Sequence, residues 1–116
     1  MHKNNVEIAE AYYTAMAEKN LEGLEKYLHP DVQLITPFAL VNGKTAVLDA
    51  VERLLAFFNT LTIRAKCGSG DEVMLAYDLD FPEPIGKIRT AVLMTFHDGL
   101  IIKYELFFDT RLFEKK

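Results

Sequence analysis

The spacing of apolar residues changes once along the chain, and this change constrains the fold more than any other feature. Up to about residue 58, apolar side chains recur every three or four positions, as they do on one face of a helix. Beyond that point they alternate with polar side chains, which is typical of strands with one buried face. A chain with helices first and strands afterwards is predicted to be an α+β domain.

The first half of the chain divides into three predicted helices and one strand. The expected helices cover residues 6–19, Leu21–Leu28 and Ala46–Phe58. Asn20 is the expected N-cap of the second helix, and Pro30 ends it because proline disfavours helical geometry in the preceding residue. Asp31–Phe38 alternates in part and carries Pro37, so we predict a short edge strand there.

The second half is predicted to be a meander of four strands. The expected strands are Leu61–Cys67, Val73–Phe81, Ile88–His97 and Leu100–Asp109. The segments between them are rich in Gly, Pro and Asp, which favour tight turns, so neighbouring strands should form antiparallel hairpins. No linker or repeat divides the 116 residues, and we expect a single domain over residues 1–116.

Composition excludes several kinds of partner. A net charge of -4 and scattered Lys and Arg residues offer no basic surface for nucleic acid. The longest apolar runs are far shorter than the roughly 20 residues of a membrane-spanning helix, so no membrane partner is expected. The single cysteine, Cys67, cannot form an internal disulfide, and the first residues do not resemble a signal peptide. These features predict a soluble, cytoplasmic protein.

Five short phrases support a family resemblance. They are Tyr12-Tyr13-Thr14-Ala15-Met16, Asn20-Leu21-Glu22-Gly23-Leu24, Leu28-His29-Pro30-Asp31-Val32, Gly43-Lys44-Thr45-Ala46-Val47, and Asp98-Gly99-Leu100-Ile101 leading to Phe107-Phe108-Asp109. In this order they resemble the SnoaL-like branch of the nuclear transport factor 2-like superfamily over nearly the whole chain. The resemblance implies a cone-shaped, curved antiparallel sheet wrapped by three helices around a pocket. Because the superfamily includes isomerases, polyketide cyclases, dehydratases, epoxide hydrolases and pure binding proteins, it does not assign an activity.

The sequence lacks the catalytic set that a resemblance to ketosteroid isomerases would imply. Tyr12 matches the tyrosine of their oxyanion hole. Their catalytic base, however, would fall at Thr36, whose hydroxyl does not take up a proton near neutral pH. Their second acid maps near Val92. Two of the three groups are missing, so steroid isomerase activity is not expected.

The epoxide hydrolases of this superfamily also lack a full match. The closing phrase Phe107-Phe108-Asp109-Thr110-Arg111 resembles theirs, but their catalytic acid would fall at Leu106. Their machinery also includes an Arg and an Asp that are separated by one residue. Here Arg89 is followed by Thr90 and Ala91, so Ala91 stands where the Asp would be. Whether the chain is an enzyme therefore stays open.

Strand alternation predicts which side chains face the pocket. If Leu106 faces inward, alternate residues of the last three strands share that face and are mainly apolar; they include Leu75, Leu79, Ile88, Val92 and Ile102. We hypothesise that the pocket binds a small, largely apolar molecule whose polar group meets tyrosine hydroxyls. The expected contacts are Tyr12, Met16, Thr36, Phe38, Phe58, Tyr77, Met94, Phe96, Tyr104 and Phe108. As an alternative, large side chains would fill the cone as core; they are Phe38, Phe58, Phe81, Phe96 and Phe108.

A second alternative is an enzyme that uses Asp78 or Asp80. Both aspartates are predicted on the outer face, together with Arg64, Lys66, Arg89, Lys103 and Glu105, where charges pair across strands. If the alternation were reversed, Asp78, Asp80, Arg89 and Glu105 would enter the pocket. They would then suit a cyclase- or isomerase-like proton transfer on a hydrophobic carbonyl compound.

The histidines are weak candidates for function. His29 has the ordinary pKa of a general base, about 6.5, but its expected place at a helix end suits contacts with carbonyl groups. His97 is expected at a hairpin tip and His2 in a frayed terminus. Because the three are widely separated in the sequence, no metal site is predicted, and no cofactor is expected.

The outer face of the predicted sheet also carries apolar residues. Ala91, Leu93, Ile101 and Phe107 are placed there among the charges. The family resemblance implies that this face pairs with a second copy of the chain, so we expect a symmetric homodimer. A dimer whose cone is filled would be an interaction module, which is the third functional alternative.

Overall fold

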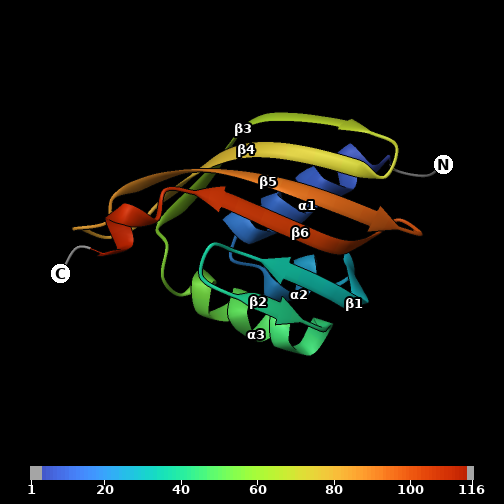
Figure 1. The fold of residues 1–116 in the computed structure, drawn as a ribbon, viewed down its shortest axis with the longest axis horizontal. Helices are drawn as coiled ribbons and strands as arrows, with labels where there is room; N and C mark the ends of the chain where they lie inside the picture. Colours follow the sequence, from blue (N-terminus) through green and yellow to red (C-terminus); the bar gives the residue numbers. More distant parts are fainter. Residues whose placement is uncertain (1–3, 115–116) are drawn as a thin grey trace.

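Helices occupy the first half of the chain and long strands the second, as the change in apolar spacing predicts (Figure 1). The computed structural model describes residues 4–114. Its elements are α1 (Asn5–Ala17), α2 (Leu21–Glu25), β1 (Leu28–Ile35), β2 (Leu40–Asn42), α3 (Lys44–Leu55), β3 (Thr60–Ser69), β4 (Glu72–Asp80), β5 (Lys87–His97), β6 (Leu100–Phe108) and a final 3-10 helix, η1 (Thr110–Glu114). The predicted α+β class is confirmed.

Side chains cap the first two helices. Glu7 and Asn4 form a capping box at α1: the Glu7 N–H donates to Asn4 Oδ1 over 2.8 Å, and the Asn4 N–H donates to Glu7 Oε1 over 3.2 Å. Asn20 caps α2, as predicted, by accepting a hydrogen bond of 2.9 Å from the Gly23 N–H. Each cap satisfies backbone donors that the first turn leaves without a helical partner.

The predicted second helix is too long: α2 ends at Glu25 rather than at Leu28, and Leu28 begins β1 instead. The reason lies far away in the sequence. Leu28 pairs with Ile101 of β6, and the Ile101 N–H donates to the Tyr27 carbonyl over 2.8 Å. The third helix is also shorter than predicted and ends at Leu55. Phe58 therefore belongs to the following loop, and its side chain is buried.

The six strands form one curved sheet in the order β2-β1-β6-β5-β4-β3. The prediction of β1 as an edge strand is wrong, because β1 lies between β2 and β6. The edge strand beside β1 is β2, whose three residues are too few to show an alternation in the sequence. The four predicted strands of the meander pair antiparallel, as expected, whereas β1 and β6 run parallel.

The predicted strand alternation is confirmed for β4 and β5, where every second side chain is buried. It fails at the start of β6. A register shift between Thr95 and Phe96 of β5 displaces the pairing with β6 by one residue. Ile101, predicted on the outer face, is therefore completely buried, and Ile102, predicted inside, is only half-buried.

Helices cover the concave face of the sheet in two parts (Figure 1). Helix α1 packs against β3 and β4, and α3 packs against β1 and β2. The short helix α2 contacts both α1 and α3. The main core is formed by the inner side chains of the sheet and the side chains of the helices that pack on them. Among the helices of residues 4–114, none has the length and apolarity that a bilayer span requires.

Candidate functional site

One end of the space beneath the sheet is filled by tyrosines. The hydroxyls of Tyr12 on α1 and Tyr104 on β6 are 2.6 Å apart and share a hydrogen bond. Their rings meet edge to face, with centroids 5.5 Å apart, and both side chains are buried. Burial raises the pKa of each hydroxyl well above its ordinary value, and the neighbouring tyrosine raises that of Tyr12 further. Both hydroxyls therefore stay protonated and satisfy each other.

The other end contains a cavity of about 280 Å³. Its walls come from the inner sides of β1, β4, β5 and β6, from α3, from the loop between β1 and β2, and from η1. The lining residues are Leu34, Thr36, Phe38, Ala39, Val41, Ala50, Leu54, Phe57, Tyr77, Leu79, Phe81, Ile88, Thr90, Leu106, Phe108 and Phe113. Most of this lining is apolar, as the hypothesis of an apolar ligand requires.

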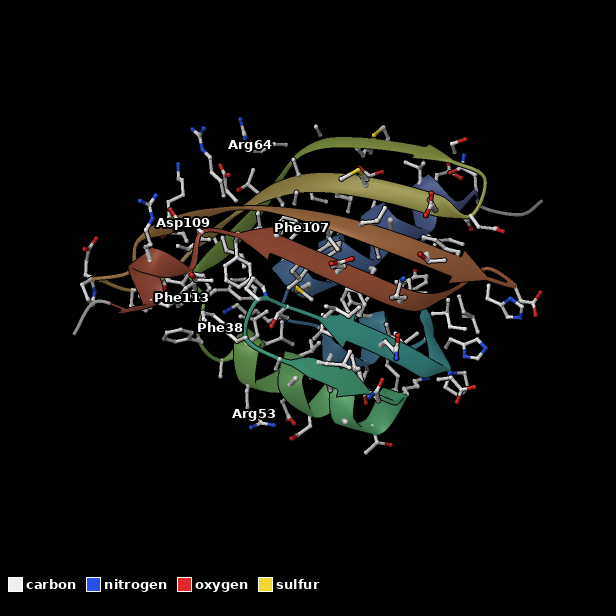
Figure 2. All side chains as sticks on the ribbon, in the orientation of Figure 1. Phe38, Arg53, Arg64, Phe107, Asp109 and Phe113 are labelled. Carbon is white, nitrogen blue, oxygen red and sulfur yellow. The ribbon has the colours of Figure 1, made fainter. Side chains whose placement is uncertain are left out.

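Aromatic rings gather where β6 runs into η1 (Figure 2). Phe113 of η1 lies with its ring centroid 5.5 to 5.7 Å from those of three other phenylalanines, Phe38, Phe81 and Phe108. Asp109 holds the start of η1 by accepting hydrogen bonds from the backbone N–H and the guanidinium of Arg111. This turn therefore carries Phe113 to the cavity.

Three polar side chains lie among the lining residues. The Thr36 hydroxyl accepts hydrogen bonds of 3.0 Å from the N–H groups of Phe38 and Ala39, so it is engaged in the loop. Tyr77 and Thr90 are direct partners across β4 and β5. Thr90 is 5% exposed, and its Oγ1 atom has no hydrogen-bond partner among the described residues. Thr90 is thus a residue of the cavity wall whose hydroxyl has no partner within the described chain.

The cavity carries little titratable chemistry. Among the lining residues that the structure describes, Tyr77 is the one ionisable side chain. Burial raises its pKa well above the ordinary range, although a contact with Tyr13 acts in the opposite direction. Tyr77 is therefore a neutral hydrogen-bonding group near pH 7. Such a lining can contact an uncharged ligand, but among the described residues it provides no side chain that exchanges a proton near pH 7.

The ten predicted ligand contacts separate into two groups. Four of them line the cavity: Thr36, Phe38, Tyr77 and Phe108. The other six are buried in the core outside this lining: Tyr12, Met16, Phe58, Met94, Phe96 and Tyr104. The alternation of strand residues identifies the inner face, but it does not reveal how far along each strand the packed core gives way to a cavity. Phe113 was not predicted, because it follows the last strand.

The weak catalytic candidates lie away from the cavity. Asp78 and Asp80 face outward, as predicted; Oδ2 of Asp78 is 3.9 Å from Nε of Arg64, and Asp80 pairs with Lys87 across the strands. The alternation is therefore not reversed. Neither Asp78 nor Asp80 is among the residues that line the cavity.

The histidine predictions need correction. His29 lies in β1 rather than at a helix end, and its Nδ1 atom accepts a hydrogen bond of 2.9 Å from the Asp31 N–H. Its ring is 5.7 Å from that of His97, because the parallel pairing of β1 and β6 brings the start of β1 to the hairpin between β5 and β6. Over residues 4–114 no three His, Cys, Asp or Glu side chains group as metal ligands would. His2 lies outside the described residues.

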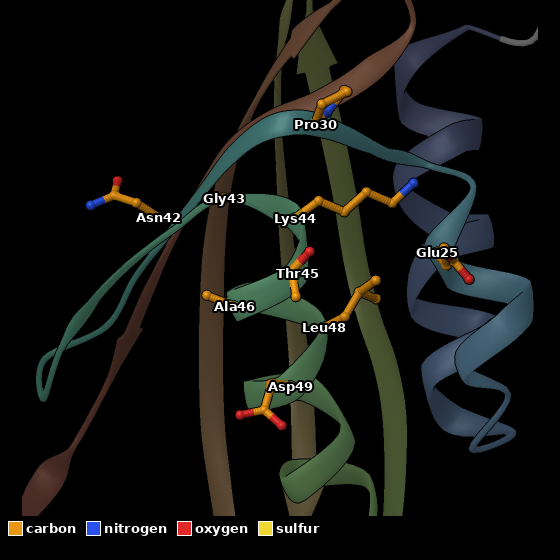
Figure 3. Close-up of a pocket in the computed structure, with 9 residues that line it drawn as sticks. All are labelled: Glu25, Pro30, Asn42, Gly43, Lys44, Thr45, Ala46, Leu48 and Asp49. Atoms are coloured by element: carbon orange, nitrogen blue, oxygen red, sulfur yellow. The ribbon is translucent and has the colours of Figure 1, made fainter.

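A larger but shallow hollow lies on the opposite side of α3 (Figure 3). It surrounds the first turn of the helix and is lined by Glu25, Pro30, Asn42, Gly43, Lys44, Thr45, Ala46, Leu48 and Asp49. Gly43 begins the helix with φ of 92°, a conformation that suits glycine, and no side chain caps this end. Because the hollow is more open and mostly surrounds exposed side chains, the apolar cavity is the stronger candidate site.

The outer face of the sheet keeps part of its predicted apolar character. Met74 and Phe107 are 43% and 46% exposed, and Ala91 and Leu93 lie between them on β5. Figure 2 shows Phe107 on the strand that ends near η1. Ile101, the fourth residue predicted for this face, is buried instead.

Comparisons with known proteins agree with this architecture. Similar solved structures include an NTF2-like protein of unknown function from Cytophaga hutchinsonii (TM-score 0.88, 17% identity, covering 99% of this chain and 98% of that one). A steroid delta-isomerase from Pseudomonas aeruginosa has a TM-score of 0.80 at 22% identity, covering 98% and 89% of the two chains. TerC, co-crystallised with polyporic acid, has a TM-score of 0.81 at 20% identity, covering 95% of each chain.

One of the two sequence comparisons assigns a family. The search of curated proteins finds no match. The family model described as the SnoaL-like domain matches residues 9–104, from the first half of α1 to the middle of β6. The chain belongs to the SnoaL-like domain family.

Proposed function

We propose that this protein binds a small, largely apolar molecule in the cavity between the sheet, α3 and η1. The observation that carries the proposal is an apolar cavity of about 280 Å³, lined by inner side chains of the sheet together with residues of α3 and η1. Protein interiors usually leave few voids larger than a water molecule, because close packing stabilises them. A space of this size, with aromatic walls, is close to the lower limit for small-molecule sites, about 300 Å³.

The cavity volume limits the size of the ligand. An apolar cavity of about 150 Å³ is sufficient to hold benzene. The cavity here, at about 280 Å³, is nearly twice that volume and suits a molecule of two rings. Flat rings would contact the phenylalanines of the wall, including Phe38, Phe81 and Phe108. Similar folds include TerC, which was co-crystallised with polyporic acid, and this agrees with a small-molecule ligand.

Binding is favoured over acid-base catalysis by the chemistry of the wall. General acids and bases work best when their pKa lies near the working pH. Tyr77, whose pKa is raised by burial, is the one titratable side chain among the described lining residues. Asp78, the aspartate nearest to it in sequence, points to the other face of the sheet. We therefore propose a binding protein rather than an isomerase or cyclase.

The binding proposal can be tested with naphthalene and two matched variants of α3. Ala50 lines the cavity, whereas Ala46, one turn earlier, is exposed and lies outside the cavity lining. We expect naphthalene to bind the parent protein and Ala46→Phe, but not Ala50→Phe, in a calorimetric titration. Its binding should also raise the unfolding temperature, since a ligand specific for the folded state stabilises it. Equal binding to all three proteins would show that the cavity is not the site.

We also propose a second copy of the chain as the partner of the outer sheet face. Exposed Met74 and Phe107 lie near side chains of both signs, Lys103 and Glu105 on β6. A face that carries both charges beside apolar residues can be complementary to itself across a two-fold axis. This arrangement supports a homodimer whose two cavities both remain available.

A further inference from the structure

We propose that the ligand is an uncharged aromatic molecule with one hydroxyl or carbonyl oxygen, and that this oxygen is bound by the hydroxyl of Thr90. The inference rests on the proposed function, since it describes the chemistry of the same cavity. It adds a specificity residue, Thr90, that neither the family match nor the ligand prediction from sequence identifies.

The Thr90 hydroxyl makes no hydrogen bond within the described chain. Its Oγ1 atom is buried without a hydrogen-bond partner, although the residue lines the cavity. A buried polar group without a partner destabilises a protein, and valine would fill the same space in a strand without that cost. A polar group that the fold does not use, placed in the wall of a cavity, is explained by a partner on the ligand.

The neighbours of Thr90 indicate the shape of that partner. Thr90 pairs with Tyr77 of β4 on one side and with Phe108 of β6 on the other. Side chains paired across strands have their Cβ atoms roughly 5 Å apart, so the hydroxyl lies between two aromatic residues. A flat ring that contacts either of them would carry its oxygen close to Thr90.

The lining also determines the charge of the ligand. No Lys, Arg or His is found among the described residues around the cavity, and no Asp or Glu. A carboxylate or an ammonium group placed there would lose its hydration without gaining an ion-pair partner, which is strongly unfavourable. A hydroxyl or a carbonyl needs only one or two hydrogen bonds, and Thr90 provides one as donor or acceptor.

Three probes of similar shape test this specificity: naphthalene, 1-naphthol and 1-naphthoate. Their dissociation constants would be measured by calorimetry for the parent protein, Thr90→Val and Thr90→Ser. Valine keeps the shape of the side chain and removes the hydroxyl, whereas serine keeps the hydroxyl. Comparing the naphthol-to-naphthalene affinity ratio between variants cancels the difference in hydration of the two probes, because both ratios use the same molecules in water.

We expect this ratio to fall about three- to tenfold in Thr90→Val, the range for the loss of one neutral hydrogen bond, and to persist in Thr90→Ser. Naphthoate should bind more weakly than either neutral probe. An unchanged ratio in Thr90→Val, or tightest binding by naphthoate, would overturn this inference while leaving the binding function in place. Failure of every probe to bind the parent protein would overturn both.

Discussion

The hydrogen bond between Tyr12 and Tyr104 predicts a strongly non-additive pair of mutations. Replacing either tyrosine by phenylalanine removes one hydroxyl and leaves the other buried without its partner. Such an orphaned group costs about 1 to 3 kcal/mol. Removing both hydroxyls leaves two phenylalanine rings of the same shape and no unsatisfied group, which can be nearly neutral. We therefore expect each single variant to be less stable than the double variant.

Urea unfolding, followed by circular dichroism, would measure the effect. With a slope of about 1 to 3 kcal/mol per M urea, a loss of about 2 kcal/mol lowers the midpoint by roughly 1 M. The four proteins of the cycle give a coupling free energy that isolates the hydroxyl pair. If the double variant lost the sum of the two single effects, the hydroxyls would not be partners. Naphthalene affinity should stay unchanged throughout, because neither tyrosine lines the cavity.

Two further predictions concern the surface. Hydrogen bonds from Arg111 lower the pKa of the Asp109 carboxyl from 3.8 to about 2, so any stability from this pair is present above about pH 4 and lost as pH falls through 2. Carboxyl carbon chemical shifts should show this pKa rising in Arg111→Gln, and no rise would contradict the pairing. Phe107→Asp should convert the proposed dimer to a monomer, as measured by light scattering. Arg53→Asp, which changes an exposed side chain of α3, should leave the dimer intact. A parent protein that is already monomeric would refute the dimer.

Local patterns in the sequence predict the parts of the fold that depend on neighbouring residues. The alternation along β4 and β5, the cap at Asn20 and the antiparallel hairpins follow from short segments. Long-range pairing decides the parts that were missed. Leu28 looks like the end of a helix until Ile101 is placed beside it, and the register shift near Phe96 reverses the orientation expected for Ile101.

The candidate site is predictable only in outline. An apolar inner face follows from alternation, and Tyr77 and Phe108 were identified in this way. The division between core and cavity depends on contacts across the whole chain, such as the one between Tyr12 and Tyr104, which are 92 residues apart. The role of Phe113 depends on a turn that begins after the last strand. Neither relation leaves a periodic signal in the sequence.

The parallel pairing of β1 with β6 has a consequence for the order of folding. Residues 28–35 are synthesised early, yet β6, one of their two partner strands, spans residues 100–108. During synthesis, the edge of β1 that pairs with β6 therefore stays unpaired until almost the whole domain has been made. Because such distant contacts close slowly, we expect most of the native sheet to assemble after synthesis, in a single late step.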